Sequence, residues 1–349
     1  MTWISNLSPV AQFALFSALK IVCVFGVLMF IVAYAVCVER KVCAAIQDRH
    51  GPNRAGIFGL LQPAADGVKA FLKEDFTPGH VRKTYFWLAP AIVMIPSLMT
   101  IAIIPFGSQL AGQKMVIADL NVGILYTFGI VSLGVYGIVL AGYAANSKYP
   151  FLGGIRSSAQ MISYEIAMGM SVVPIFMIVG GLNLSQVIQY QTGSFGHWLI
   201  LKQPLAFGIF LAAMFAETNR LPFDLPESEQ ELAGGYNVEY SSIKFALFFM
   251  GEYAAVTAAS AMMVTLFLGG WTLPIAGLDK PAQSIGIGLL QVGVFLTKML
   301  CVEFMVIWVR WMWPRFRYDQ LMDLGWRRFI PLALANIVAT AGVLWVTTK

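Results

Sequence analysis

Acidic residues are concentrated in one segment of a chain that is otherwise strongly apolar. The segment AETNRLPFDLPESEQELAGGYNVEYS holds six of the 18 acidic residues of a chain that is 58% hydrophobic. The six are Glu217, Asp224, Glu227, Glu229, Glu231 and Glu239. Carboxylates this close together repel one another, so some of them are expected to hold a proton near neutral pH. Such groups can exchange protons with a reacting molecule.

The same segment contains too many apolar residues for a plain surface loop. Phe223, Leu225 and Tyr236 stand among the acids, while Pro222 and Pro226 stiffen the backbone. We therefore expect the segment to pack over or into another part of the molecule. A loop that docks a basic partner is the alternative interpretation.

Two more glutamates lie inside long apolar stretches, Glu165 in AQMISYEIAMGMS and Glu252 in FALFFMGEYAAV. A charged side chain at mid-bilayer costs at least about 2.5–3.5 kcal/mol unless it is paired or hydrated. Because burial disfavours the ionised form of a carboxyl, both glutamates are expected to hold or pass a proton. The neighbouring Tyr164 and Tyr253 are candidate hydrogen-bond partners. An ion pair with a purely structural role is the alternative.

A third set of polar residues follows the first apolar stretch. The segment VERKVCAAIQDRHGPNRAG contains Arg40, Lys41, Arg49 and Arg54. A turn at 51–53 is expected to bring Arg49 and Arg54 back toward the membrane face, although anchoring at the membrane surface would also explain these charges. The charges lie beside the bilayer and do not resemble a nucleic-acid-binding surface, so no nucleic acid partner is expected.

The residue patterns that bind redox cofactors are missing. The four cysteines form no CxxC pair, and the three histidines lie between the apolar stretches. The sequence has no GxxxxGK[ST] motif and no GxGxxG motif that opens a helix. The chain is therefore expected to bind no flavin, haem, iron–sulfur cluster or metal ion.

The elements that must position these residues are membrane-spanning helices. Continuous apolar runs exclude the alternating pattern of a β-barrel, so the expected class is an all-α polytopic membrane protein. We expect a single membrane domain over residues 1–349 with eight transmembrane helices, of which the fifth is short for a bilayer crossing. The spans lie at about 13–38, 86–106, 119–143, 157–181, 204–217, 242–269, 283–309 and 327–347.

Basic residues are distributed unevenly between the two ends of these spans. The segments after spans 1, 3, 5 and 7, together with the first residues of the spans that follow them, hold 17 of the 23 Lys and Arg residues. By the positive-inside rule these segments face the cytoplasm, and both termini lie on the periplasmic side. The two long cytoplasmic loops are 39–85 and 217–241.

The first of these loops contains an amphipathic pattern. In LLQPAADGVKAFLKED, Leu61, Val68 and Leu72 recur at helical spacing, and Asp66 and Lys69 fall on the other side. The pattern predicts an amphipathic helix at the membrane surface. A plain anchoring helix without a role in chemistry is the alternative.

Five segments together resemble the quinone-site membrane subunit of respiratory complex I, which is the H subunit of bacterial NADH:quinone oxidoreductase. They are VERKVCAAIQDRHGPNRAG, LLQPAADGVKAFLKED, NSKYPFLGGIRSSAQMISYE, AETNRLPFDLPESEQELAGGYNVEYS and PRFRYDQLM. The segments follow the order of the family and extend from about residue 38 to 325. The resemblance implies a multi-pass subunit of the bacterial inner membrane that is not active alone.

In that family, electrons from NADH pass through flavin and iron–sulfur clusters on peripheral subunits to a quinone in a chamber at the junction with this subunit. The implied partners are the peripheral quinone-junction subunits that carry the terminal iron–sulfur cluster, small membrane subunits and lipid. The implied substrate is a quinone, and the sequence leaves both ubiquinone and menaquinone open. Quinone reduction is linked to proton movement along a glutamate-rich path in the membrane.

The resemblance also implies roles for individual residues. Quinone binding falls to Arg40, Arg49 and Asp66 on the first loop and to Arg220, Phe223, Asp224 and Glu227 on the loop after span 5. The implied proton path consists of Glu165, Glu217, Glu227, Glu229, Glu231, Glu239 and Glu252. Glu303 lies outside the pattern of the family, and neither Glu303 nor Lys298 is given a role.

Three other interpretations remain. The chain could be the equivalent subunit of a membrane-bound hydrogenase or a plastoquinone reductase, although the complete AETNRLPFD and PRFRYDQLM segments favour the NADH-linked branch. A stand-alone ion channel or antiporter would explain Glu165 and Glu252 but not the large loops, and no internal repeat supports a common transporter fold. A structural anchor for a peripheral enzyme would not need glutamates inside spans.

Overall fold

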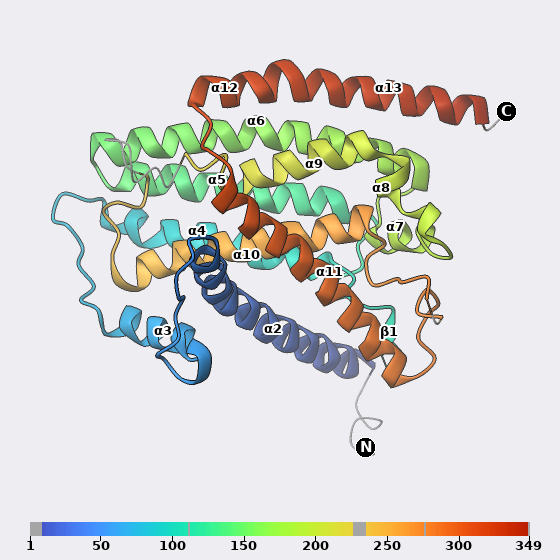
Figure 1. Ribbon diagram of the computed structural model, residues 1–349, viewed down its shortest axis with the longest axis horizontal. Helices are drawn as coiled ribbons and strands as arrows, with labels where there is room; N and C mark the ends of the chain where they lie inside the picture. Colours follow the sequence, from blue (N-terminus) through green and yellow to red (C-terminus); the bar gives the residue numbers. More distant parts are fainter. Residues whose placement is uncertain (1–8, 111, 226–234, 276, 348–349) are drawn as a thin grey trace.

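The chain folds into a bundle of long helices (Figure 1). The computed structural model describes residues 9–110, 112–225, 235–275 and 277–347. Among these residues, seven helical segments are long and apolar enough to cross a membrane, which confirms the expected helical membrane class. They are α2 (Pro9–Ile46), α4 (Lys83–Thr100), α5 (Gly123–Ala144), α6 (Lys148–Val179), α10 (Ser242–Phe267), α11 (Ile285–Met312) and α12 (Tyr318–Asp323), which continues through a π-helical turn (Leu324–Phe329) into α13 (Ile330–Thr347).

The helix in the range of the fifth expected span is short. α9 (Pro204–Glu217) has 14 residues. At about 1.5 Å per residue it is shorter than the ~30 Å hydrocarbon core of a bilayer. Of the eight expected spans, seven therefore correspond to described helices that are long and apolar enough to cross a membrane. The remaining one corresponds to α9, which is a shorter apolar helix. Apart from α3 (Gln62–Leu72), the remaining described elements are small: α7 (Leu184–Tyr190), α8 (Leu199–Lys202), short 3-10 turns, and the hairpin of β1 (Gln109–Leu110) and β2 (Gln113–Lys114).

Several helices extend beyond the ranges that hydropathy predicts. α2 continues to Ile46, so Glu39 and Arg40 lie on its last turns and not in a loop. α6 begins at Lys148, nine residues before the expected span at 157. Apolarity marks the part of a helix inside the membrane, whereas the backbone hydrogen bonds of the helix continue through the polar residues beyond it.

α3 (Gln62–Leu72) lies in the range of the expected amphipathic helix, at the edge of the bundle (Figure 1). None of its residues is buried, and the apolar Leu72 is 82% exposed. The hydroxyl of Ser242, at the start of α10, donates to the carbonyls of Ala70 and Lys73 at 3.0 and 2.9 Å. The end of α3 is thereby attached to α10.

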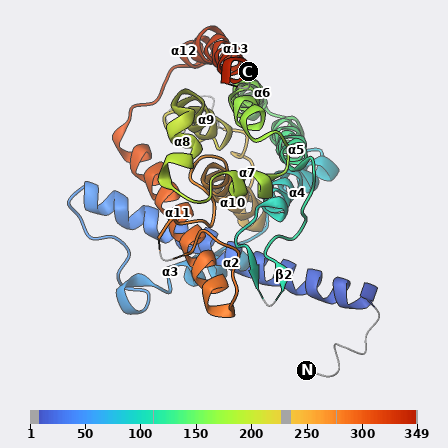
Figure 2. The same cartoon turned by 90° about the vertical axis from the view of Figure 1, so that its right-hand side faces the viewer.

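α10 is the most deeply buried of the long helices and packs against α2, α4 and α11 (Figure 2). α12 and α13 lie along the outside of the bundle, where α13 packs against α6 and α9 (Figures 1 and 2). We call the end of the bundle that carries segments 47–82, 218–225 and 235–241 the loop end. The last turns of α2 and α11 and the first turns of α10 meet there.

Glycines allow the central helices to approach closely. A Cβ atom on Gly137 of α5 would lie 2.5 Å from Val93 Cγ2 and 2.9 Å from the Val93 backbone nitrogen on α4. On α10, a Cβ atom at Gly251 would lie 3.3 Å from Met94 Cα. Small residues permit such close packing of membrane helices. The adjacent Glu252 is 12% exposed.

Candidate functional site

Four charged side chains from four parts of the chain form a buried group, which we call the ion network. Arg220, in the segment after α9, lies 3.4 Å from Glu39 Oε2 on α2 and 2.9 Å from Glu252 Oε1 on α10. Arg310 of α11 donates to the other oxygen of Glu39 at 2.5 Å. The four side chains are between 3% and 17% exposed. Their charges therefore interact with little screening by water.

An aromatic side chain adjoins the ion network. The hydroxyl of Tyr253 donates to Glu39 at 2.7 Å, and its ring centroid lies 4.2 Å from the guanidinium carbon of Arg220. A cation over an aromatic ring is stabilised, and more so where water is excluded. Tyr253 therefore contacts both members of one ion pair.

Neither tyrosine that neighbours a buried glutamate in the sequence bonds that glutamate. The hydroxyl of Tyr164 donates to the carbonyl of Leu321 at 2.8 Å, and the hydroxyl of Tyr253 donates to Glu39. Glu165 instead accepts a hydrogen bond from Ser132 of α5. The expected tyrosine partners are wrong because successive residues of an α-helix point about 100° apart.

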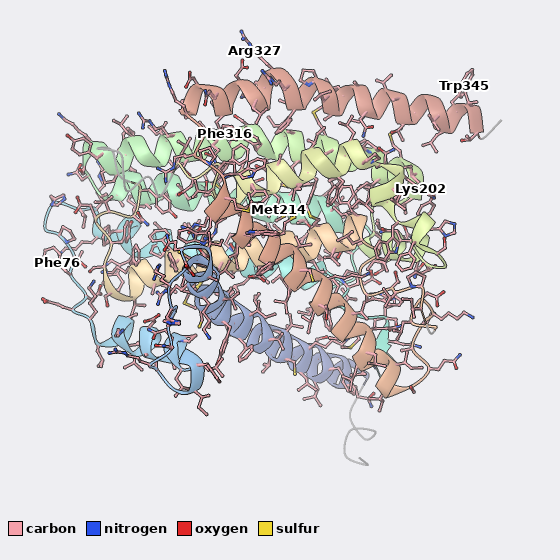
Figure 3. All side chains as sticks on the ribbon, viewed as in Figure 1. Phe76, Lys202, Met214, Phe316, Arg327 and Trp345 are labelled. Carbon is pink, nitrogen blue, oxygen red and sulfur yellow. The ribbon has the colours of Figure 1, made fainter. Side chains whose placement is uncertain are left out.

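The segment that carries Arg220 is fixed by α6. Gln160 of α6 donates from Nε2 to the carbonyls of Ala216 and Phe223 at 2.8 and 2.7 Å. The ring of Phe223 packs 5.4 Å from the ring of Phe316, which lies on the segment that joins α11 to α12 (Figure 3). These contacts hold the turn after α9 in the position that directs Arg220 toward α2 and α10.

Two residues expected to bind quinone belong to this packing. Phe223 and Asp224 are each 4% exposed. Phe223 also packs against Tyr164, with 5.2 Å between the ring centroids, and Asp224 pairs with Arg315 at 2.9 Å. The structure thus places both residues in contacts that shape the segment around Arg220.

A pocket of about 540 Å³ lies at the loop end, and we call it the loop-end pocket. Arg40 and Arg49 line it, and Arg40 pairs with Asp66 of α3 at 2.6 Å. The structure therefore brings together the three residues of the first loop that the sequence predicts to act together. The other lining residues are Val36, Glu39, Cys43, His50, Gly51, Pro52, Phe249, Tyr253, Arg310 and Trp311.

A second cavity, of about 100 Å³, lies among α4, α5, α6, α9 and α10, and we call it the central cavity. Its lining is mostly apolar and includes Phe210 and Met214, which lies in the interior of the bundle (Figure 3). Two carboxyls, those of Glu217 and Glu252, also line it. Glu252 therefore belongs both to the ion network and to the central cavity.

Glu217 is a buried acid without a partner among the described residues. It is 8% exposed, and neither of its carboxylate oxygens has a hydrogen-bond partner in that part of the chain. It interacts electrostatically with Glu165 of α6. Burying a carboxylate without a partner is costly, and a second carboxyl nearby increases the cost. The pair is therefore suited to hold and exchange a proton.

Four further acids belong to the expected proton path: Glu227, Glu229, Glu231 and Glu239. Glu227, Glu229 and Glu231 lie outside the described residues. Glu239 is half-buried in the turn that precedes α10.

Within the described part of the chain, no group of three or more His, Cys, Asp or Glu residues could hold a metal ion.

Three residues of the site are absent from the sequence-based expectations: Glu39, Arg310 and Ser132. Glu39 carries a weak signal, since it is an acid beside a basic run at the end of the first span. Arg310 is 271 positions from Glu39, and neither hydropathy nor spacing connects the two. Contacts of this kind depend on how the helices pack.

Comparison with known proteins identifies the family. A family model described as NADH dehydrogenase matches residues 19–341. The NADH-quinone oxidoreductase H subunit numbered 1 from Cytophaga hutchinsonii is 46% identical over 340 residues, which cover 95% of this chain and 98% of that protein. The H subunit numbered 2 from Koribacter versatilis is 45% identical over 359 residues (98% and 100%), and the one numbered 2 from Syntrophobacter fumaroxidans is 48% identical over 332 residues (94% and 96%). The chain therefore belongs to the NADH dehydrogenase family, within the group of NADH-quinone oxidoreductase H subunits.

Proposed function

We propose that this chain forms part of the quinone-binding chamber of the oxidoreductase and carries the glutamate path that couples quinone reduction to proton translocation. The observation that carries the proposal is the position of the ion network between two cavities. Glu39 and Arg310 line the loop-end pocket, whereas Glu252 lines the central cavity. Arg220 pairs with both Glu39 and Glu252. A change of charge at one cavity therefore reaches the other through a single guanidinium.

The loop-end pocket has the chemistry that a quinone headgroup needs. Arg40, Arg49 and His50 supply N–H donors for the carbonyl oxygens of a quinone. Phe249 and Trp311 supply flat apolar surface for its ring. The substrate is accordingly a membrane quinone, either ubiquinone or menaquinone.

Other residues of the proposed chamber act by holding these groups in place. Asp66 binds Arg40 and so orients one of the donors. Phe223 and Asp224 fix the segment that carries Arg220. Glu227 is assigned to the chamber and to the proton path by its place in the motif that resembles the family.

The proposed proton path runs from the loop end through Glu252 to Glu217 and Glu165. A reduced quinone takes up protons at its oxygens, and the positive charge of Arg310 beside the pocket favours the negative charge that precedes this uptake. Arg310 also pairs with Glu39, so a shift of Arg310 toward the headgroup weakens that pair. Further members of the proposed path are Glu227, Glu229, Glu231 and Glu239, which are assigned by their places in the motif that resembles the family.

In the membrane, we assign α9 to the fifth of eight crossings and place both termini on the periplasmic side of the bacterial inner membrane. Loops 39–85 and 217–241 then face the peripheral subunits, of which the one with the terminal iron–sulfur cluster delivers electrons to the quinone. NADH and flavin are bound by those other subunits. Small membrane subunits and lipid cover the exposed apolar faces of the helices.

The proposal is tested with the assembled complex in inverted membrane vesicles. Glu252→Gln is expected to lower both the NADH:quinone rate and the proton gradient, while NADH oxidation with an artificial acceptor stays normal. Arg40→Ala is expected to lower the NADH:quinone rate in the same selective way. Asp279→Asn, a change of the same type between α10 and α11, serves as the control. Normal quinone reduction and a normal gradient in both site variants would refute the proposal.

A further inference from the structure

Glu303 is a buried carboxyl that the proposed chamber and path do not use. It lies on α11 and is 3% exposed, and its neighbours on the same face, Met299 and Val306, are apolar. The hydroxyl of Thr257 donates to its Oε1 at 3.3 Å. Its Oε2 has no hydrogen-bond partner among the described residues. Most buried polar atoms in proteins have a hydrogen-bond partner, so this oxygen is unusual.

Glu303 faces the ion network. It lines a small cavity together with Glu39, Arg220, Tyr253 and Arg310. The charged and titratable groups that line this cavity with it, in the described part of the chain, are Glu39 from α2, Arg220 from the segment after α9, Tyr253 from α10 and Arg310 from α11. Arg220 in turn pairs with Glu252 of α10.

This cluster has one more acid than base. Among the described residues, three carboxyls (Glu39, Glu252 and Glu303) accompany two guanidiniums (Arg220 and Arg310). An uncompensated charge is strongly disfavoured when it is buried away from water. A proton bound to one of the three carboxyls removes the excess negative charge of these five side chains. Glu39 and Glu252 are both engaged in ion pairs, so Glu303 is the carboxyl that can hold this proton without breaking one.

We propose that Glu303 is an additional proton-transfer residue of this subunit, which holds a proton while Glu39 and Glu252 are ionised and gives it up when their ion pairs rearrange. The inference rests on the proposed function, because it adds a branch to the same path. Arg310 lines both the loop-end pocket and the cavity of Glu303, so its charge acts on groups in both.

The transfer is a simple proton exchange. Negative charge on a reduced quinone headgroup attracts Arg310 and leaves Glu39 with less positive charge beside it. The O–H bond of Glu303 then breaks, and an O–H bond forms on Glu39, directly or through a water molecule in the cavity. The new carboxylate of Glu303 takes Arg220 as its counter-ion. The total charge of the cluster is unchanged by this step.

The test compares Glu303→Gln and Glu303→Asp in the assembled complex in inverted membrane vesicles. Glutamine keeps the size of the side chain but cannot release a proton, whereas aspartate restores a titratable group. Glu303→Gln is expected to oxidise NADH normally with an artificial acceptor and to lose proton translocation per NADH oxidised through quinone. Its pH profile of quinone reduction is expected to lack one ionisation step. Glu303→Asp is expected to restore that step at a shifted pH.

Cys301→Ser, an exposed position on the same helix, is the matched control. A translocation ratio and a pH profile of Glu303→Gln equal to those of the control would overturn the inference. If the glutamine variant does not assemble, the aspartate variant decides: a shifted pH profile supports the inference and an unchanged profile overturns it.

Glu217→Gln in the same vesicles separates this inference from the proposed function. If Glu217→Gln loses translocation and Glu303→Gln does not, only the role of Glu303 is wrong. If both variants translocate protons normally, the glutamate path itself is wrong.

Discussion

Arg310 Nη1 lies 2.5 Å from Glu39 Oε1, although the two residues are 271 positions apart in the chain. The pair joins the last turns of α11 to the last turns of α2 at the loop end. Both residues line the loop-end pocket, and both also face the cavity of Glu303. Any event in the pocket that displaces Arg310 therefore removes a counter-ion from a buried acid.

Glu39→Gln is expected to destabilise the subunit within the complex. The substitution leaves Arg220 and Arg310 with one carboxylate fewer in a buried site, and removal of one partner from a buried ion pair typically costs about 3–5 kcal/mol. Thermal dissociation of the purified complex measures the effect, with Asp279→Asn as the control.

The double variant Glu39→Gln/Arg310→Met shows whether the pair itself is responsible. Because the double variant removes both charges, its loss of stability is expected to be smaller than the sum of the losses caused by the two single substitutions. Simple additivity would contradict a direct interaction between the two side chains.

Lys298→Met is expected to lower stability without changing proton translocation. Nζ of Lys298 donates to three carbonyls just beyond the end of α10, those of Leu268, Gly270 and Thr272, at 2.7, 3.1 and 2.7 Å. It also lies 4.5 Å from the ring centroid of Trp198. A buried carbonyl that loses its donor costs about 1–3 kcal/mol. A lower ratio of protons to NADH at unchanged thermal stability would show that Lys298 acts in the path.

Gln160→Leu is expected to loosen the start of the acidic segment. Leucine fills a similar volume but leaves the carbonyls of Ala216 and Phe223 without their donor, at about 1–3 kcal/mol for each carbonyl left unsatisfied. Hydrogen exchange of residues 217–225 is expected to become faster, and the NADH:quinone rate to fall, while oxidation with an artificial acceptor is unchanged. Gln189→Leu, at an exposed position on α7, is the control. Unchanged hydrogen exchange at residues 217–225 would show that the two hydrogen bonds of Gln160 do not hold this segment in place.

The site residues that hydropathy reveals are those whose own positions are unusual. Glu165 and Glu252 are conspicuous because a carboxyl is costly inside an apolar stretch. The structure places Glu165 beside Ser132 on α5 and Glu252 beside Arg220. The helices likewise follow the apolar stretches, because burial in a membrane imposes continuous apolarity on the chain.

The partners of these residues could not be predicted in the same way. Glu39 and Arg310 meet only because α2 and α11 converge at the loop end, and hydropathy carries no information about which helices touch. Glu303 stands in an apolar stretch like Glu252, but its surroundings are assembled from three helices and the segment after α9. The expected tyrosine partners of Glu165 and Glu252 are wrong for a simpler reason. Two residues that are adjacent in the sequence of a helix point in different directions, so their side chains do not meet.

Asp119 links β2 to the start of α7 at the opposite end of the bundle, and its contribution to stability is expected to depend on pH. Its carboxylate accepts hydrogen bonds from Lys114, Asn183 and Ser185 at 2.7, 2.9 and 3.2 Å. Burial by itself raises the pKa of Asp119, but the hydrogen bonds from Lys114 and Asn183 outweigh it and hold the pKa below its ordinary value of 3.8. A carboxyl with a lowered pKa in the folded state stabilises that state above the ordinary value, and this contribution disappears as the pH falls through the lowered pKa.

Hydrogen exchange of residues 183–190 in the purified complex measures this contribution, after correction for the intrinsic pH dependence of exchange. Protection is expected to fall in acid by an amount on the order of 1 kcal/mol or less, because the Lys114 side chain is mostly exposed to water. Asp119→Asn removes the charge at every pH, so its protection at neutral pH should already be reduced and should change little on acidification. Equal protection of the variant and the wild type at neutral pH would show that the charge of Asp119 does not hold these segments together.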